Sequence, residues 1–336
     1  MRFEKQKSSI ERVVGVPPEG EREIMKGMAE TFDAQDIEKL KTKEREKTKE
    51  ELVVIDLAND ATNALRREYG MDDFDVPAKN VHIIPRKKWP KEMAHELGSC
   101  LELDQAIIIR EETQSRIQFL TTAIHELLHF KSYTALRMTG GKEESGAVGI
   151  GRYRNGLSTV SRDGAQVYFT ALNEAITQEL SKRLLEEVLV RERESPLFAE
   201  EIQNTETVVR RYGGVRTSDG RRLIPPGTLY AAPRSSKPVE DISDYLSRGG
   251  SVDVKALTYS WQRRILVSLV KNIYQKHADQ FKNESEVFDV FARAYMTGDL
   301  LPMGRLVEET YGKGSFKKLA TLDLGDEKAS DRKAEK

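Results

Sequence analysis

Cysteine is nearly absent from this chain of 336 residues, which contains only Cys100. A single cysteine excludes an internal disulfide framework and is compatible with a reducing compartment. Long apolar runs are also missing. No stretch approaches the roughly 20 apolar residues of a membrane span, and the first residues, MRFEKQKSSIERVVGV, lack the apolar core of a secretory signal. We therefore expect a cytoplasmic protein with no membrane partner.

The chain also lacks an excess of charge of either sign. It has 54 lysines and arginines and 55 aspartates and glutamates, for a formal net charge of -1. Because these charges are mixed along the chain, they leave no broad basic surface for nucleic acid or for an anionic membrane. We therefore expect no nucleic-acid partner. Partners must be inferred from local sites, and the sequence carries no indication of the oligomeric state.

Composition and turn signals divide the chain into five segments. With 38% hydrophobic residues, the chain can form one large or two modest domains. The segments are a charged N-terminal segment at 1–48, a first globular domain at 49–191, an irregular connector at 192–250 with one hairpin, a helical lobe at 251–320 and a disordered tail at 321–336. The N-terminal segment is typical of a solvated helix or a linker, and it could also cover a cleft.

The first globular domain mixes the periods of helices and strands. Its sequence predicts a helix that ends near Gly70, then strands NVHIIP and QAIIIR, then a helix at 113–137, a hairpin around SRDG and a last helix at 172–191. Beyond 251 the apolar residues recur at helical spacing alone. We therefore expect an α+β domain followed by an all-helical lobe.

The stretch HELLH at 125–129 lies in the middle of the predicted 113–137 helix. His125 and His129 share one face of that helix, so each can aim a ring nitrogen at a common metal ion. Glu126 is rotated by about 100° and borders this face without having to bind the metal. This is the pattern H-E-x-x-H, in which Zn²⁺ lowers the pKa of a bound water to about 7 and the glutamate is the general base of peptide hydrolysis. The alternative is a pair of histidines that merely packs or faces water.

A catalytic zinc ion needs a third protein ligand. The other three histidines have no spacing that nominates them, and His95 in AHELGS has Ser99 where a second ligand would stand, so we expect a carboxylate. Glu174, in LNEAITQEL, follows His129 by 45 residues (174 minus 129) on the next predicted helix, and antiparallel packing could bring it to the metal. Periodicity alone does not choose Glu174, because it lies opposite the apolar side of its helix and could be a solvated acid.

HELLH followed by a helix that begins NEAIT resembles the gluzincin metallopeptidases, the thermolysin-like group, and in its compactness the minigluzincins. The resemblance implies that His125, His129 and Glu174 bind Zn²⁺ and that Glu126 is the general base. It implies a zincin-like domain at 49–191, in which a small mixed sheet with an edge strand for the substrate lies beside an active-site helix and a glutamate helix.

The resemblance also nominates the substrate strand. In the family, the strand before the active-site helix pairs with an extended peptide, and here that strand is QAIIIR. Ala106 and Ile107 are therefore expected near a peptide or protein substrate. The resemblance covers residues 51–190, and specific identity is confined to the two motifs.

Two departures from the family pattern matter for function. Gln178 stands where thermolysin-like enzymes carry an acid that orients the first histidine, although a glutamine carbonyl can still accept the imidazole N–H of His125. The signature G-A-M-E-N of the aminopeptidase branch does not occur. Its absence favours an endopeptidase over an aminopeptidase.

An oxyanion donor is expected outside the metal motifs, because relatives supply a tyrosine or a histidine there. Tyr153, Tyr168 and His277 are the candidates, although Tyr168 also fits strand packing and His277 also fits a helix surface. In GRYRNG, Arg152 or Arg154 could hold a substrate carboxylate, or both could be solvated.

Three functional hypotheses remain open at this point. The first is a zinc-dependent endopeptidase or oligopeptidase. The second is a latent regulatory metallopeptidase that cleaves one protein partner and is gated by residues 1–48 or by the helical lobe. The third is a non-catalytic scaffold in which zinc is structural or absent. Glu126 distinguishes this hypothesis from the two enzyme hypotheses, because a structural metal site gains nothing from a neighbouring base.

Overall fold

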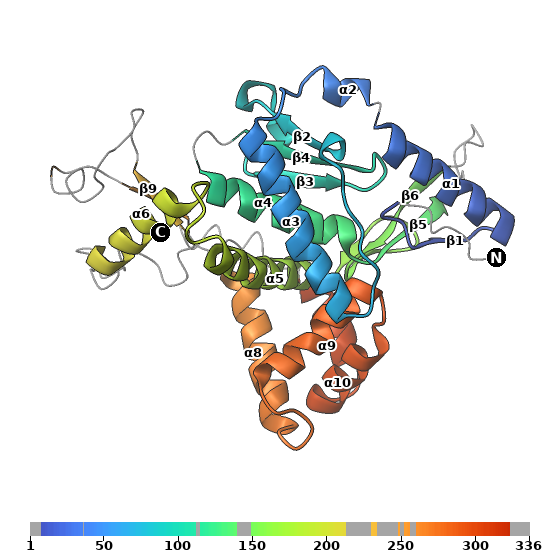
Figure 1. The fold of residues 1–336 in the computed structure, drawn as a ribbon. Coiled ribbons are helices and arrows are strands. Elements are labelled where there is room, and N and C mark those ends of the chain that lie inside the picture. The colour runs from blue at the N-terminus through green and yellow to red at the C-terminus, as the bar shows by residue number, and fades with distance from the viewer. Residues whose placement is uncertain are drawn as a thin grey trace.

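The computed structural model describes residues 8–35, 37–111, 115–139, 149–212, 230–233, 248, 252–255 and 260–322. The chain forms an α+β structure in which two sheets and the helices between them lie above an all-helical C-terminal part (Figure 1). Among the described residues, no helix combines the length and the apolar character that a bilayer crossing requires. The predicted fold class is confirmed at this level.

The three-stranded sheet has the order β2-β4-β3. Strand β4 (Ala106–Arg110) is parallel to β2 (Val81–Ile84) and antiparallel to β3 (Gly98–Leu101). QAIIIR is therefore the central strand, and Ala106 and Ile107 are fully buried. The prediction that it forms the edge beside the substrate is wrong, because the polar connection predicted between the two strands contains a third one, β3.

Helix α4 (Arg116–Lys131) carries the HELLH motif and is shorter than predicted. Ser115 caps its start by accepting a hydrogen bond from the N–H of Gln118, and the chain turns extended at Ser132. Strand β5 (Thr134–Thr139) follows at once, where the sequence predicted helix to residue 137. The apolar residues of TALRMT fit both periods, and the pairing of β5 with two neighbouring strands decides between them.

The larger sheet has the order β1-β5-β6-β7-β8. Its other strands are β1 (Arg12–Val14), β6 (Gly149–Asn155), β7 (Ser158–Val160) and β8 (Val167–Tyr168). The predicted single hairpin around SRDG is two successive turns. One is centred on Gly156, whose φ of 55° favours glycine, and the other is SRDG itself, after which α5 (Thr170–Arg191) begins.

Within the first 48 residues, the described positions 8–35 and 37–48 contribute to the folded core, and the prediction of a solvated helix or linker is wrong there. Strand β1 pairs in parallel with β5, and α1 (Pro18–Ala34) and α2 (Glu38–Lys41) follow it. Phe32 on α1 is 1% exposed, and its ring centroid lies 5.3 Å from that of Phe74 and 6.1 Å from that of Phe130. Charge dominates the composition of this segment, but the described side chains of its valine, isoleucine, leucine, methionine and phenylalanine residues are buried or partly buried against the rest of the fold.

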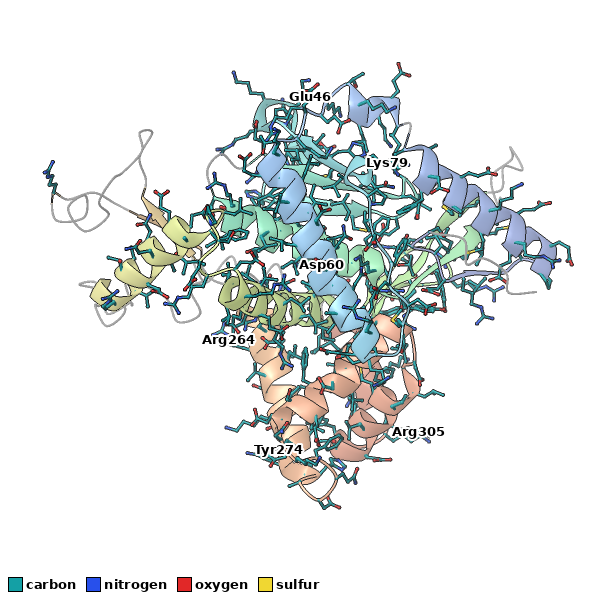
Figure 2. All side chains as sticks on the ribbon, viewed as in Figure 1. Glu46, Asp60, Lys79, Arg264, Tyr274 and Arg305 are labelled. Carbon is teal, nitrogen blue, oxygen red and sulfur yellow. The ribbon has the colours of Figure 1, made fainter. Side chains whose placement is uncertain are left out.

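Three long helices surround the main core. Helix α3 (Lys49–Glu68) packs on α4, and α4 packs on α5. A capping box between Thr48 and Glu51 starts α3, and the side chain of Asp60 on its outer face points to solvent (Figure 2). The buried faces of α4 and α5 contact each other, which places HELLH beside NEAIT.

The C-terminal part contains α8 (Ser260–Lys276), α9 (Glu284–Thr297), α10 (Leu301–Tyr311) and α11 (Ser315–Ala320). It packs on α5 through α8 and α9. The connector predicted as irregular contains helix α6 (Ala199–Tyr212) and strand β9 (Tyr230–Pro233). Strand β10 (Val252–Lys255) pairs antiparallel with β9 and lies where helix was expected. Apart from β9, Arg248 and β10, residues 213–259 lie outside the described residues, as does the tail after 322.

Candidate metal centre

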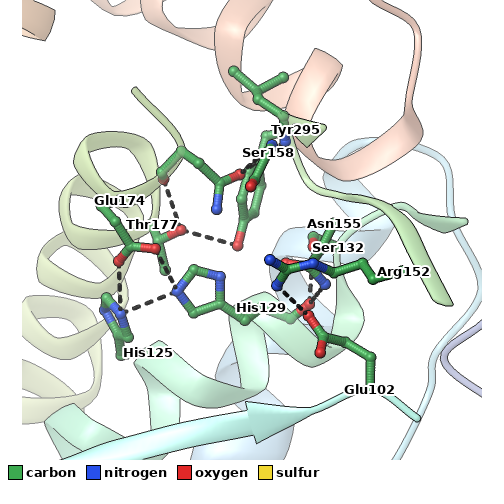
Figure 3. Close-up of polar contacts among 12 residues, drawn as sticks. Glu102, His125, His129, Ser132, Arg152, Asn155, Ser158, Glu174, Thr177 and Tyr295 are labelled. Atoms are coloured by element: carbon green, nitrogen blue, oxygen red, sulfur yellow. Dashed lines mark hydrogen bonds and ion pairs between the residues drawn. The ribbon is translucent and has the colours of Figure 1, made fainter. Parts of the chain in front are cut away.

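The three predicted metal ligands converge from two helices. His125 and His129 lie on α4 and Glu174 lies on the first turns of α5 (Figure 3). The two Nε2 atoms are 3.2 Å apart. Glu174 places Oε2 3.5 Å from His125 Nε2 and Oε1 3.5 Å from His129 Nε2. These side chains form a group that could hold a metal ion.

The separations fit a tetrahedral zinc site. Ligand atoms about 2.0 to 2.1 Å from a zinc ion lie about 3.3 to 3.4 Å apart at the tetrahedral angle. The observed distances of 3.2 and 3.5 Å bracket this value. Two imidazoles and one carboxylate are also a donor set that zinc accepts in hydrolytic enzymes, with a fourth position left for water or substrate. The residues present therefore fit the group that the motif predicts.

The charges within the cluster are strongly coupled. Burial disfavours the ionised form of Glu174, but the charge of His129 and hydrogen bonds from both histidines hold the pKa of Glu174 well below its usual range. Burial acts to lower the pKa of His129, and the neighbouring Glu174 carboxylate outweighs it and raises that pKa. The carboxylate is thus ionised at neutral pH and faces both ring nitrogens, as a metal ligand must.

Glu126 lies beside the three ligands and has a different environment. Its side chain is 6% exposed. Burial raises the pKa of Glu126 to about 7, the charge of His125 opposes the shift, and that of Glu174 adds to it. A carboxyl group with a pKa near neutrality can take up and return a proton under cellular conditions.

Gly98 on strand β3 leaves the space that Glu126 occupies. A Cβ atom at position 98 would lie 2.7 Å from Glu126 Cγ, 2.8 Å from its Oε1 and 2.9 Å from Thr122 Cγ2. Distances under 3 Å are shorter than real contacts, so any side chain at position 98 must displace the carboxyl group. Sequence reasoning missed this role, although Gly98 stands directly in AHELGS, the partial repeat of the motif.

A cleft of about 720 Å³ opens over the cluster. It is lined by α4, α5, strand β6 and strand β3, which is the outer strand of the three-stranded sheet in the described part of the chain. The N–H of Arg110 donates to the carbonyl of Leu97, so in this antiparallel pair the backbone groups of Gly98 and Cys100 point to the free edge. The cleft therefore exposes an unpaired strand edge beside the candidate metal site.

The two candidate arginines on β6 are in different places. Arg154 is buried and ties β6 to the helical part, since its guanidinium donates to the carbonyls of Gly156, Ala294 and Gly298. Arg152 lines the cleft and pairs with Glu102 at 3.1 Å (Figure 3). The tertiary structure thus separates a buried, structural arginine from one that lines the cleft.

The structure does not bring the predicted oxyanion donors to the cluster. The Tyr168 hydroxyl donates to Gln166 on the surface, and neither Tyr168 nor Tyr153 lines the cleft. His277 follows α8 and lies 3.0 Å from Thr310 of α10, near Tyr274, whose position at the far end of the helical part is shown in Figure 2. The nominations of Tyr168 and His277 find no support in this geometry.

The other sequence candidates have clear positions. His82 is 1% exposed and contacts Glu44, and His95 lies at the exposed rim of the cleft, so neither joins the metal ligands. Cys100 is half-buried in the cleft wall. Gln178 lines the same cleft, one turn after Glu174.

Further residues that support the site come from distant parts of the chain. Asn155 donates to the carbonyl of His129 at 2.9 Å. Glu201 on α6 accepts from the Ser115 hydroxyl at 2.5 Å and from the N–H of Arg116 at 2.8 Å, so a carboxylate caps the start of α4. No short-range pattern could have nominated either residue, because each acts through tertiary contact.

Comparisons with protein-family models, with curated proteins and with solved structures find no match for this chain.

Proposed function

We propose that the protein is a zinc-dependent endopeptidase or oligopeptidase. The observation that carries the proposal is the convergence of His125, His129 and Glu174 at distances that suit zinc, with Glu126 beside them under an open cleft. A structural zinc site is usually closed by a fourth protein ligand, whereas this group has three ligands among the described residues and faces the cleft.

In the proposed reaction, the metal ion and Glu126 have different roles. When bound, a zinc ion supplies Lewis-acid chemistry, polarising a carbonyl and making water a better nucleophile. Glu126 accepts the proton that the attacking water loses and gives it to the nitrogen of the leaving amine, so it begins and ends each cycle ionised. The buried position of Glu126 keeps its pKa near 7, which suits both transfers.

The free edge of β3 supports a peptide substrate. An extended peptide can add to this edge by hydrogen bonding to the backbone groups of Gly98 and Cys100, which brings its chain past Glu126. This replaces the predicted position of the substrate beside Ala106 and Ile107.

The regulatory alternative receives no specific support from the described residues. None of those before Lys49 lines the cleft, and Phe32 and β1 contribute to the folded core. Removal of residues 1–48 is therefore expected to destabilise the fold rather than to raise activity.

Glu126→Gln tests the proposal directly. The variant should keep about one zinc ion per chain, by elemental analysis after desalting, and should lose cleavage of a peptide library by roughly a thousandfold or more, because a positioned base and acid is removed from both proton transfers. Glu187→Gln on the exposed face of α5 is the matched control and should behave as wild type. Zinc binding without any cleavage by the wild-type chain would favour the scaffold hypothesis instead.

A further inference from the structure

Arg152 is the one lysine or arginine among the described residues that line the cleft. The other charged groups in that lining, apart from histidines, are the carboxylates of Glu96, Glu102, Glu126 and Glu174. The link between β6 and the helical part is made by the neighbouring Arg154, not by Arg152.

The contacts of Arg152 leave most of its donors for a ligand. A guanidinium has five N–H donors in a planar fork. Within the described residues, the side chain of Arg152 donates one hydrogen bond, from Nη1 to Glu102 Oε1. Arg152 is 40% exposed and Glu102 is 13% exposed, so a molecule that enters the cleft meets the guanidinium before the carboxylate.

The backbone of Glu102 is anchored by a buried side chain, and its carboxylate contacts the guanidinium. Glu102 begins the turn between β3 and β4, where the side chain of buried Gln105 donates to the carbonyl of Glu102 and to the hydroxyl of Ser9. Glu102 thus engages one nitrogen of the Arg152 guanidinium (Figure 3), and the other donors of this cleft-lining side chain are left for a ligand. Planar arginine forks bind carboxylates in pairs of parallel hydrogen bonds.

We propose that Arg152 recognises a carboxylate of the bound peptide, either an acidic side chain or the free C-terminal carboxylate, so that the substrate class is peptides with a negative charge at one fixed place. The inference rests on the proposed peptidase function. The recognition is local, because Glu96, Glu126 and Glu174 disfavour negative charge elsewhere in the cleft.

The test compares cleavage of a peptide library by wild type and by Arg152→Met, with products identified by mass spectrometry. Wild type should favour Asp or Glu at a single position relative to the cleaved bond, or should cleave near a free C-terminus. Amidation of all C-termini separates these two sources, because it abolishes only the second preference. Matched Glu and Gln peptides should differ roughly tenfold or more in kcat/KM, the size of one charge-assisted hydrogen bond.

The variants make the test specific. Arg152→Met should erase the preference, Arg152→Lys should keep part of it, and Arg86→Met, which removes an exposed positive charge outside the cleft, should leave it intact. Zinc content and thermal unfolding confirm that each variant folds. Binding of the same peptides to Glu126→Gln, which is not expected to turn them over, should show the same preference in Kd.

The possible outcomes distinguish a failure of this inference from a failure of the proposed peptidase function. A wild type that cleaves peptides without an acidic preference, or whose preference survives Arg152→Met, overturns the assignment and leaves the peptidase function standing. A preference for basic residues that Glu102→Gln removes overturns it in favour of Glu102. A chain that holds zinc and cleaves nothing removes the proposed function, and the inference with it.

Discussion

Two buried polar clusters lie at the C-terminal half of α4, one around Lys131 and one around His125 and His129. They differ in the partners that their polar atoms find. Lys131 is 1% exposed, and its Nζ donates to Thr62 Oγ1 at 2.9 Å, Asn63 Oδ1 at 2.9 Å and the carbonyl of Asn59 at 3.3 Å. All three of these acceptors belong to α3. The histidines two and six positions before Lys131 instead face each other and Glu174, under a cleft.

The difference separates a structural cluster from a candidate metal site. Buried polar groups normally find partners within the protein, and the Lys131 cluster follows this rule. In the metal cluster, two imidazole nitrogens and a carboxylate converge at ligand spacing and are open to incoming molecules. In the C-terminal half of α4, Lys131 therefore anchors the helix on α3, while His125 and His129 on another side of the helix line the cleft.

The largest effect should come from removing the carboxylate of the metal cluster. Glu174→Ala is expected to weaken zinc binding more than 100-fold, since even outer-shell partners of metal ligands are worth 10- to 100-fold. The thermal unfolding temperature of wild type should rise on addition of zinc, and that of the variant should not. Glu187→Ala on the same helix is the control, and retention of zinc by Glu174→Ala would place the third ligand elsewhere.

Gly98→Ala tests the space that the metal cluster requires. The added methyl group must displace Glu126, and a misplacement of about 1 Å can cost roughly 100-fold in rate. We expect kcat/KM for peptides to fall by about that factor while zinc content stays near one per chain. Ser99→Ala, the next residue on β3, should have little effect, and an equal loss in both variants would argue for general damage to the strand.

Lys131 should make the free energy of unfolding depend on pH. Burial lowers the pKa of Lys131 from 10.5 to about 7. Between about pH 7 and 10.5 the unfolded chain therefore binds a proton that the folded chain does not, so the free energy of unfolding rises with pH in this window.

The slope from this one group is at most about 1.4 kcal/mol per pH unit, and Lys131→Met should lack it. Urea unfolding of both proteins at pH 7.5, 8.5 and 9.5 measures the difference. Parallel curves would show that Lys131 is protonated in the folded state throughout, with Asn63 and Thr62 compensating its charge.

The smallest expected effect comes from one acceptor of Lys131. Thr62→Val removes a hydroxyl that accepts from Lys131 and donates to the carbonyl of Ala58. The free energy of unfolding should fall by about 1 kcal/mol, the usual value of one such hydrogen bond. Zinc affinity should not change, and a variant that loses zinc would show that the two clusters are coupled through α4.

Local sequence was sufficient for the parts of the site that lie on one helix. The i, i+4 spacing of His125 and His129 places them on one face wherever the helix forms, and Glu126 must then border that face. The α+β class and the helical C-terminal part also follow from periodicity, because each element buries its own apolar stripe.

Other features depend on contacts between segments that are distant in the chain, and the local periodicity of the sequence does not predict them. Glu174 was nominated by resemblance, and the packing of α5 on α4 brings it within 3.5 Å of both histidines. The edge strand is β3 rather than QAIIIR because pairing on both sides buries β4. Strand β5 was taken for helix because its apolar residues suit either period until neighbouring strands supply hydrogen bonds.

The sequence by itself determined the chemistry within α4, since the geometry of a helix fixes the relative directions of residues one and four positions apart. Only the tertiary structure decided that Arg152 faces the cleft while Arg154 is buried, and that Gly98 must lack a side chain. The physical reason is that the exposure of a side chain and the space beside a backbone depend on contacts between segments distant in the chain. The periodicity of either segment does not reveal these contacts.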